Sequence, residues 1–243
     1  MKHYIVGDIH GEYATLLKLV EETPRGSRLI FVGDLVDKGP QSAQVIKFVR
    51  EHNIACVMGN HEAMMIEYGT AFIASIEEGE PITQENLWLE NGGVATLLSY
   101  GLVSLENHKM IPHPFIHEFL FQFKEDIAWL KSLPIYLEPK VEHDSGRRVV
   151  VSHAAIGLVW ALRENKEHHE AFIQQVLWNR SKPTANIPIF NIFGHTPHKN
   201  GIDIHGHYVN VDTGCFITRD KAYGRLSAYC LENGEVVSIE RVG

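Results

Sequence analysis

The chain has 243 residues, 44% of them hydrophobic, and we expect one globular domain over residues 1–243. Its formal net charge of −8 argues against a general nucleic-acid binder, because phosphate backbones are held by an excess of Lys and Arg. Three cysteines are too few for a disulfide framework, and no apolar run approaches the roughly 20 residues that cross a bilayer, so we expect a cytoplasmic protein without a membrane partner.

The first half of the chain repeats a strand, a polar loop and a helix. Apolar runs over residues 4–6, 29–32 and 54–58 each stop at a glycine, and helical patterns follow the first two, over about 16–20 and 41–52. This alternation predicts a largely parallel sheet. Because ligands bind beyond the carboxyl ends of parallel strands, the polar clusters after these runs should lie together.

The second half of the chain begins with helices and ends with strands. Residues 62–133 have mainly helical patterns, and we expect them to form a cap beside the site. Longer apolar runs then cover residues 148–152 and 187–193. Short strands follow over residues 201–204 and 208–211, and residues 225–231 and 236–241 complete the run. Consecutive strands indicate mixed pairing, so we predict an α/β fold in which two packed mixed sheets form a sandwich flanked by helices.

The residues at the strand ends are carboxylates, imidazoles and one amide: Asp8, His10, Asp34, Asp37, Asn60, His61, His153 and His195. This set suits manganese, iron, zinc or magnesium, and it contains no thiolate. Two such cations repel each other unless negative charge lies between them, and Asp34 is placed centrally enough to bridge them. A water between two such ions loses its proton near neutral pH and becomes a nucleophile.

Three ordered motifs carry a resemblance. They are Gly-Asp-Ile-His-Gly at residues 7–11, Gly-Asp-Leu-Val-Asp-Lys-Gly at 33–39 and Gly-Asn-His-Glu at 59–62. They resemble the signatures of the phosphoprotein phosphatase family of metallophosphoesterases, and Ser152-His153-Ala154, Gly194-His195 and Leu177-Trp178-Asn179-Arg180 match further family stretches. The resemblance is closest to the short bacterial and bacteriophage-lambda-type serine/threonine phosphatases, and it implies the four-layer metallophosphoesterase fold. Bacterial diadenosine tetraphosphate hydrolases have the same motifs.

The resemblance implies two divalent metal ions per chain, with manganese as the first choice and iron, zinc or magnesium as alternatives. Asp8 and His10 would hold the first ion, and Asp34 would bridge both. The ligands of the second ion would be Asn60, His153 and His195. The oligomeric state is not predicted.

The resemblance also implies a proton donor and phosphate contacts. His61, paired with Asp37, is similar to the general acid of the family, which protonates the leaving alkoxide. Arg180, Asn60 and Lys38 would contact the substrate phosphate. Lys38 stands where the family usually has arginine, and lysine lacks the bidentate fork. We therefore expect weaker phosphate binding or a changed substrate preference rather than inactivity.

The leading functional hypothesis is a phosphatase that hydrolyses phosphomonoesters, chiefly phosphoserine and phosphothreonine in proteins, by direct attack of a metal-bridging hydroxide. The alternative is a hydrolase of dinucleoside polyphosphates or capped RNA ends, in which Trp88 or Tyr68 stacks on a base; core packing explains Trp88 equally well. A non-catalytic phosphate-binding scaffold is disfavoured, because every expected ligand is present. The expected partners are thus phosphorylated proteins or small phosphorylated molecules.

For Asp212, a turn and a substrate contact remain alternatives, and His198, His205 and His207 are expected to be exposed loop histidines.

Overall fold

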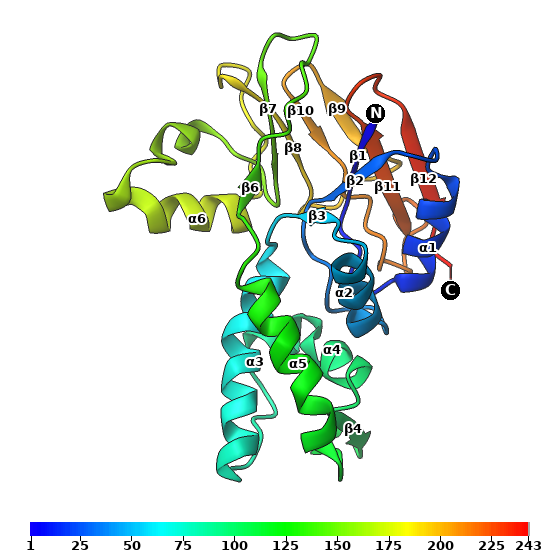
Figure 1. Cartoon of the computed structure of the whole chain (residues 1–243), viewed down its shortest axis with the longest axis vertical. Helices are drawn as coiled ribbons and strands as arrows, with labels where there is room; N and C mark the ends of the chain where they lie inside the picture. Colours follow the sequence, from blue (N-terminus) through cyan, green and yellow to red (C-terminus); the bar gives the residue numbers. More distant parts are fainter. Residues whose placement is uncertain (243) are drawn as a thin grey trace.

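The computed structural model describes residues 1–242 and places two five-stranded sheets at the centre of the molecule (Figure 1). The first sheet consists of β1 (His3–Val6), β2 (Arg28–Phe31), β3 (Ala55–Cys56), β11 (Arg225–Cys230) and β12 (Val236–Glu240), in the order β12-β11-β1-β2-β3. The second consists of β6 (Tyr136–Leu137), β7 (Arg148–Ser152), β8 (Ile189–Phe193), β9 (Asp203–His205) and β10 (Tyr208–Asn210), in the order β6-β7-β8-β10-β9. Both sheets mix parallel and antiparallel pairs, as predicted.

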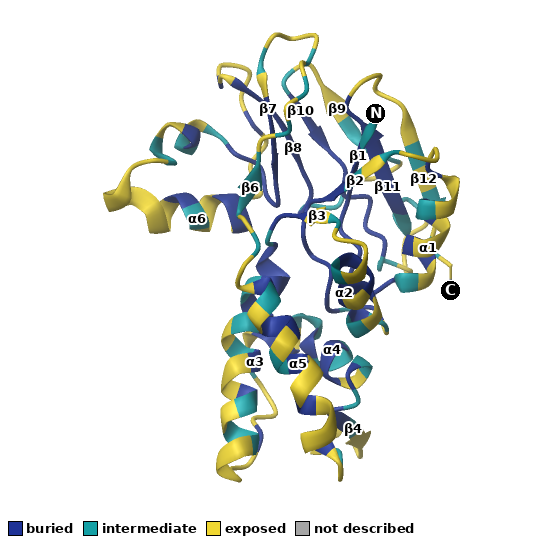
Figure 2. Ribbon diagram, in the orientation of Figure 1, coloured by how far each residue is buried: buried dark blue, intermediate teal, exposed yellow. Residues whose placement is uncertain are grey.

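The two sheets pack face to face through apolar side chains that alternate along their strands. Ile5 and Ile30 of the first sheet share one buried cluster with Val151 and Ile192 of the second. Figure 2 shows the central strands as buried. The outer faces are covered by α1 (Tyr13–Glu22) and α2 (Ser42–Glu51) on the first sheet and by α6 (His169–Trp178) on the second. The predicted sandwich flanked by helices is therefore confirmed.

The cap projects from one end of the sandwich (Figure 1). It contains α3 (Asn60–Glu78), a π-helical turn (Leu89–Gly93), α4 (Val94–Ser99), the hairpin β4 (Val103–Glu106) and β5 (Lys109–Pro112), and α5 (Ile116–Leu130). The hairpin departs from the mainly helical pattern expected here, and Asn107 and His108 make its turn in the left-handed region. Cap residues such as Phe123 share a buried cluster with Phe31 of the first sheet, and we propose that cap and sandwich fold as one domain.

β3 and β6 depart from the sequence prediction, whereas the other predicted strands begin and end within two residues of their predicted bounds. β3 contains only Ala55 and Cys56, because the backbone N–H of Met58 turns away and donates to the carbonyl of Pro134 (2.8 Å). β6, which was not predicted, pairs with β7 as a short edge strand. Two-residue strands carry too little apolar periodicity to be recognised from sequence.

The structure adds two observations on the cysteines and on membrane-spanning segments. Cys56, Cys215 and Cys230 are buried free thiols. Within residues 1–242, none of the helices combines the length and the apolar character that crossing a membrane requires.

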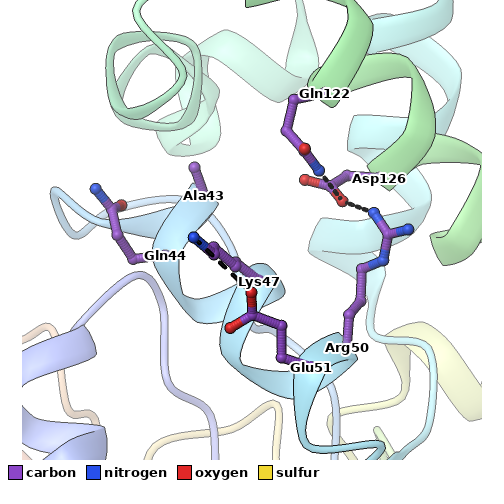
Figure 3. Close-up of a pocket in the computed structure, with 7 residues that line it drawn as sticks. All are labelled: Ala43, Gln44, Lys47, Arg50, Glu51, Gln122 and Asp126. Carbon is purple, nitrogen blue, oxygen red and sulfur yellow. Dashed lines mark hydrogen bonds and ion pairs between the residues drawn. The ribbon is translucent and has the colours of Figure 1, made fainter.

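A buried carboxylate ties the cap to α2 (Figure 3). Asp126 of α5 is 1% exposed and pairs with the guanidinium of Arg50. It also accepts hydrogen bonds from the Tyr100 hydroxyl (2.7 Å) and the Gln122 amide (3.0 Å). All three of these side chains donate to the carboxylate, so Asp126 joins α5 and α4 of the cap to α2 of the sandwich.

Replacing Arg50 with methionine is expected to lower the free energy of unfolding by about 1–3 kcal/mol, because the buried Asp126 carboxylate loses its cation. Chemical denaturation measures this change. The matched control is Lys47→Met on the same helix, whose pair with Glu51 is exposed and should contribute less than about 0.5 kcal/mol. Equal losses in the two variants would contradict a special role for the Arg50–Asp126 pair.

Candidate metal centre

The predicted site residues converge from both sheets. The loops after β1 and β2 carry Asp8, His10, Asp34 and Asp37, and the first turn of α3 carries Asn60 and His61. The loops after β7 and β8 carry His153 and His195. All of them are buried. His10, Asp34 and His61 form one group, and Asp34, His153 and His195 form another, with the ligand atoms of each group within 4.8 Å of one another. Asp34 belongs to both groups, which is the position that a bridging ligand requires.

The backbone of these loops is strained at the candidate residues themselves. His10, Asp34, Asp37 and His195 have φ angles of 47°, 50°, 72° and 68°, in the left-handed region that residues with a Cβ rarely adopt. Such strain persists only where surrounding contacts impose it, and it clusters at functional sites.

Gly194 shows how closely the loops pack around the carboxylates. A Cβ at Gly194 would lie 2.0 Å from Oδ1 of Asp8, although the glycine itself has an ordinary φ. Gly59 is similar, since its Cβ would lie 2.2 Å from Oδ1 of Asp34. At both positions only a glycine leaves the neighbouring carboxylate in place.

Replacing Gly194 with alanine is therefore expected to displace the Asp8 carboxylate and to lower both kcat and metal content. A misplacement of about 1 Å in a catalytic constellation costs on the order of 100-fold in rate. The measurement is kcat with saturating manganese, together with metal per chain by mass spectrometry. Gly206→Ala is the control, because its Cβ would meet nothing within 4 Å. Unchanged metal content in the Gly194 variant would contradict the assignment of Asp8.

Two imidazoles are fixed so that a lone pair faces the centre. Nδ1 of His10 lies 2.9 Å from the carbonyl of Val36, and Nδ1 of His153 lies 2.9 Å from the carbonyl of Val32. Because a carbonyl only accepts, each Nδ1 carries the proton. Burial lowers the pKa of His10 to about 3 and also lowers the pKa of His153, so both rings are neutral and present an unprotonated Nε2.

The unprotonated nitrogen of His153 lies close to the oxygens of Asn60 and Asp34. Nε2 of His153 lies 2.8 Å from Oδ1 of Asn60 and 3.4 Å from Oδ1 of Asp34. Nδ1 of His195 lies 2.9 Å from the same Asn60 oxygen, and burial lowers the pKa of His195 to about 3. Nε2 of His153 and the oxygens of Asn60 and Asp34 are acceptors that converge, and such acceptors repel unless a donor or a cation lies among them. The donor set therefore fits a divalent metal ion.

The carboxylates give the same indication. Burial, reinforced by Asp212 and Asp34, raises the pKa of Asp8. Burial also raises the pKa of Asp212 to about 7. For Asp34, burial would raise the pKa, but the surrounding histidines outweigh it and the pKa is lowered. Crowded buried carboxylates call for positive charge, and metal ions would supply it.

His61 differs from the other histidines in its partner. Its Nδ1 lies 2.6 Å from Oδ2 of Asp37, and its backbone N–H donates to Asp34 (3.0 Å). Burial alone would lower the pKa of His61, but Asp34 and Asp37 outweigh burial and raise it. An imidazole whose positive charge is stabilised by two carboxylates is suited to donating a proton.

Sequence reasoning missed Glu62 as a structural acceptor. Its carboxylate accepts the backbone N–H groups of Asp34 (2.7 Å), Leu35 (2.8 Å) and Gly59 (2.8 Å), and so joins two strand-end loops. The signal was present, because Glu62 ends the Gly-Asn-His-Glu motif at the start of α3.

Asp212, for which the sequence left a turn and a substrate contact as alternatives, is buried and accepts the N–H of Gly214 (2.8 Å).

Of the predicted phosphate contacts, Asn60 is buried among the ligands, whereas Lys38 and Arg180 are more accessible. Lys38 is half-buried, with Nζ 5.7 Å from the centroid of the Phe216 ring. Arg180 is exposed, and its NH1 group lies 3.4 Å from the carbonyl of His195. Trp88 is 1% exposed, so it offers no face to a nucleobase, and its core-packing interpretation is confirmed.

The remaining histidine cluster is separate from the centre. His205 is exposed and pairs with Asp203 (3.0 Å), while His198 and His207 contact backbone carbonyls and are half-buried rather than exposed. Within the described part of the chain, none of the three belongs to a group with metal-ligand spacing. They carry no case for a third ion.

Comparisons with known proteins agree with this geometry. The family model described as calcineurin-like phosphoesterase matches residues 1–216. Serine/threonine-protein phosphatase 1 of Salmonella typhimurium is 29% identical over 224 residues, which are 87% of this chain and 85% of that protein. The symmetrical bis(5'-nucleosyl)-tetraphosphatase of Ectopseudomonas mendocina is 26% identical over 213 residues, 85% of this chain and 62% of that protein. The crystal structure of a candidate diadenosine tetraphosphatase has a TM-score of 0.62 at 22% identity, covering 100% of this chain and 95% of that one.

Proposed function

The chain belongs to the calcineurin-like phosphoesterase family of metal-dependent phosphoric ester hydrolases, and from that premise we propose that it is a phosphomonoesterase acting on phosphoserine and phosphothreonine in proteins. The observation that carries the proposal is that a carboxylate shared by two ligand groups lies next to a candidate proton donor. Asp34 belongs to two ligand groups, and the His61–Asp37 pair, joined at 2.6 Å, lies beside it.

Each residue has a role in this proposal. Asp8, His10 and Asp34 would hold one metal ion, and Asn60, His153 and His195, with Asp34 shared, would hold the other. Two divalent ions, manganese first among them, would supply the positive charge that neutralises phosphoryl oxygens and the activated water that attacks phosphorus. His61 would give a proton to the departing oxygen, while Asp37 keeps the imidazolium in place. Asn60, Arg180 and Lys38 would orient the phosphate.

A second substrate class is supported by the tetraphosphatase relative, which aligns with 85% of the chain. Hydrolysis of dinucleoside polyphosphates would use the same metal ligands but would break a phosphoanhydride bond instead of a phosphomonoester bond. The buried position of Trp88 removes one of the two side chains that could stack on a base, which favours the phosphomonoester.

The test measures consumption of a phosphothreonine peptide and of diadenosine tetraphosphate by purified protein with added manganese, with the products separated by chromatography. Faster turnover of the peptide is the expected result. Faster turnover of the dinucleotide would overturn the substrate assignment and keep the metal chemistry. No turnover of either substrate, with no bound metal, would support a scaffold instead.

Replacing Lys38 with arginine is expected to lower KM for the phosphothreonine peptide about three- to tenfold, because a planar fork of donors binds two phosphate oxygens where an ammonium offers a point charge. The change in kcat should be smaller. Steady-state kinetics on both substrates measure it. Unchanged constants would show that this position does not contact phosphate.

A further inference from the structure

The carboxylate that carries the candidate proton donor is held by the cap. Besides Nδ1 of His61, Asp37 accepts hydrogen bonds from Nε1 of Trp88, at 2.9 Å to Oδ1 and 3.0 Å to Oδ2, and from the Thr96 hydroxyl, at 2.6 Å to Oδ1. All three partners are buried, and Asp37 is completely inaccessible. The backbone N–H of Asp37 also donates to the Thr96 hydroxyl (3.0 Å), so Thr96 contacts this residue twice.

The cap is built closely against this position. Trp88 lies at the start of the π-helical turn, and a Cβ at Gly93 would lie 2.6 Å from its ring. Gly92 has a φ of 111°, and its Cβ would lie 2.7 Å from the backbone nitrogen of Lys38. The two glycines let the turn approach residues 37–38 so closely that the indole N–H reaches the carboxylate.

We propose that Trp88 and Thr96 are positioning residues for the proton donor, so that the cap sets the orientation of His61 through Asp37. This inference rests on the proposed function and assigns a role to the cap within it. Two donors fix the carboxylate plane and hold Oδ2 toward Nδ1 of His61. His61 gives its Nε2 proton to the departing oxygen as the phosphorus–oxygen bond breaks, and it keeps its Nδ1–H bond to Asp37 throughout.

The leaving group provides the readout. Phosphothreonine releases an alkoxide and depends on the proton donor, whereas p-nitrophenyl phosphate releases a stable phenolate and depends on it little. In Trp88→Phe, which keeps an aromatic ring and loses the N–H, kcat for the phosphothreonine peptide is expected to fall about 10- to 100-fold. For p-nitrophenyl phosphate kcat should fall less than about threefold, and KM for both should be unchanged.

Matched variants separate positioning from general damage. Trp129→Phe makes the same substitution on α5 of the cap and should leave both rates unchanged. Thr96→Val removes the hydroxyl and should reproduce the selective loss, whereas Thr96→Ser keeps the hydroxyl and should restore the peptide rate. Thermal unfolding of each variant reports on the fold, and the two threonine variants remain informative if Trp88→Phe unfolds.

The outcomes distinguish the two proposals. Equal losses on both phosphomonoesters, or an unchanged peptide rate in Trp88→Phe and Thr96→Val, would overturn the positioning role and leave the proposed function standing. If the unaltered protein hydrolyses neither phosphomonoester, the proposed function fails, and the positioning role in this reaction fails with it. A selective loss on the peptide, with rescue by serine at position 96, would support both.

Discussion

Replacing Asp34 with asparagine is expected to reduce kcat by about 1,000-fold or more. Asp34 alone belongs to both ligand groups, and its oxygens lie 3.4 Å from Nε2 of His153 and 3.6 Å from Nε2 of His10. An amide has the same shape, but it removes the negative charge that two cations would share and directs an N–H group at one of them.

The fold should survive this change, because the asparagine oxygen can still accept the backbone N–H of His61. The measurements are kcat, metal per chain by mass spectrometry and circular dichroism. We expect the metal content to fall below two equivalents with an unchanged spectrum. Asp220→Asn, at an exposed pair with Lys199, is the matched control and should leave all three unchanged. Retained activity in Asp34→Asn would falsify the shared-ligand mechanism.

Local patterns were sufficient to predict the framework of the site. β1 and β2 are apolar runs that are followed by a glycine, and Asp8 and Asp34 come directly after these glycines. The hydrophobic pattern therefore predicted the strands, and the motifs at their ends predicted the site residues. The sandwich followed because strands that are apolar on both sides must be covered on both faces. These inferences use only neighbours in the chain, which is why they succeeded.

The contacts of the cap could not be predicted in the same way. Trp88 and Asp37 are 51 residues apart, and Thr96 and Asp37 are 59 apart, so no local pattern joins them. A tryptophan beside two glycines is as typical of core packing as of a hydrogen bond to a carboxylate. The β4–β5 hairpin was missed because each strand has only four residues, and so short an alternation as Val103-Ser104-Leu105-Glu106 does not stand out within a region of helical patterns.

His61 is the second position where a large effect is expected, and its geometry admits two roles. It belongs to a ligand group with His10 and Asp34, since its Nε2 lies 3.9 Å from Oδ2 of Asp34, and it also pairs with Asp37 at 2.6 Å. A ligand must present a neutral nitrogen, whereas a proton donor must be protonated. Burial lowers the pKa of His10 to about 3, but Asp34 and Asp37 outweigh burial at His61 and raise its pKa. The electrostatics therefore favour the donor.

In His61→Asn, kcat for the phosphothreonine peptide is expected to fall about 10²–10⁴-fold, the usual contribution of a general acid. The loss on p-nitrophenyl phosphate should be much smaller, and metal should stay at two equivalents, because an imidazolium donor holds no ion. His205→Asn, at an exposed histidine, is the control and should change neither rate. Loss of one metal equivalent, with equal losses on both substrates, would instead make His61 a ligand. Trp88 and Thr96 would then position a metal ligand rather than a proton donor. If His61 is the proton donor, His61→Asn and Trp88→Phe should both lower the rate on the peptide much more than the rate on p-nitrophenyl phosphate.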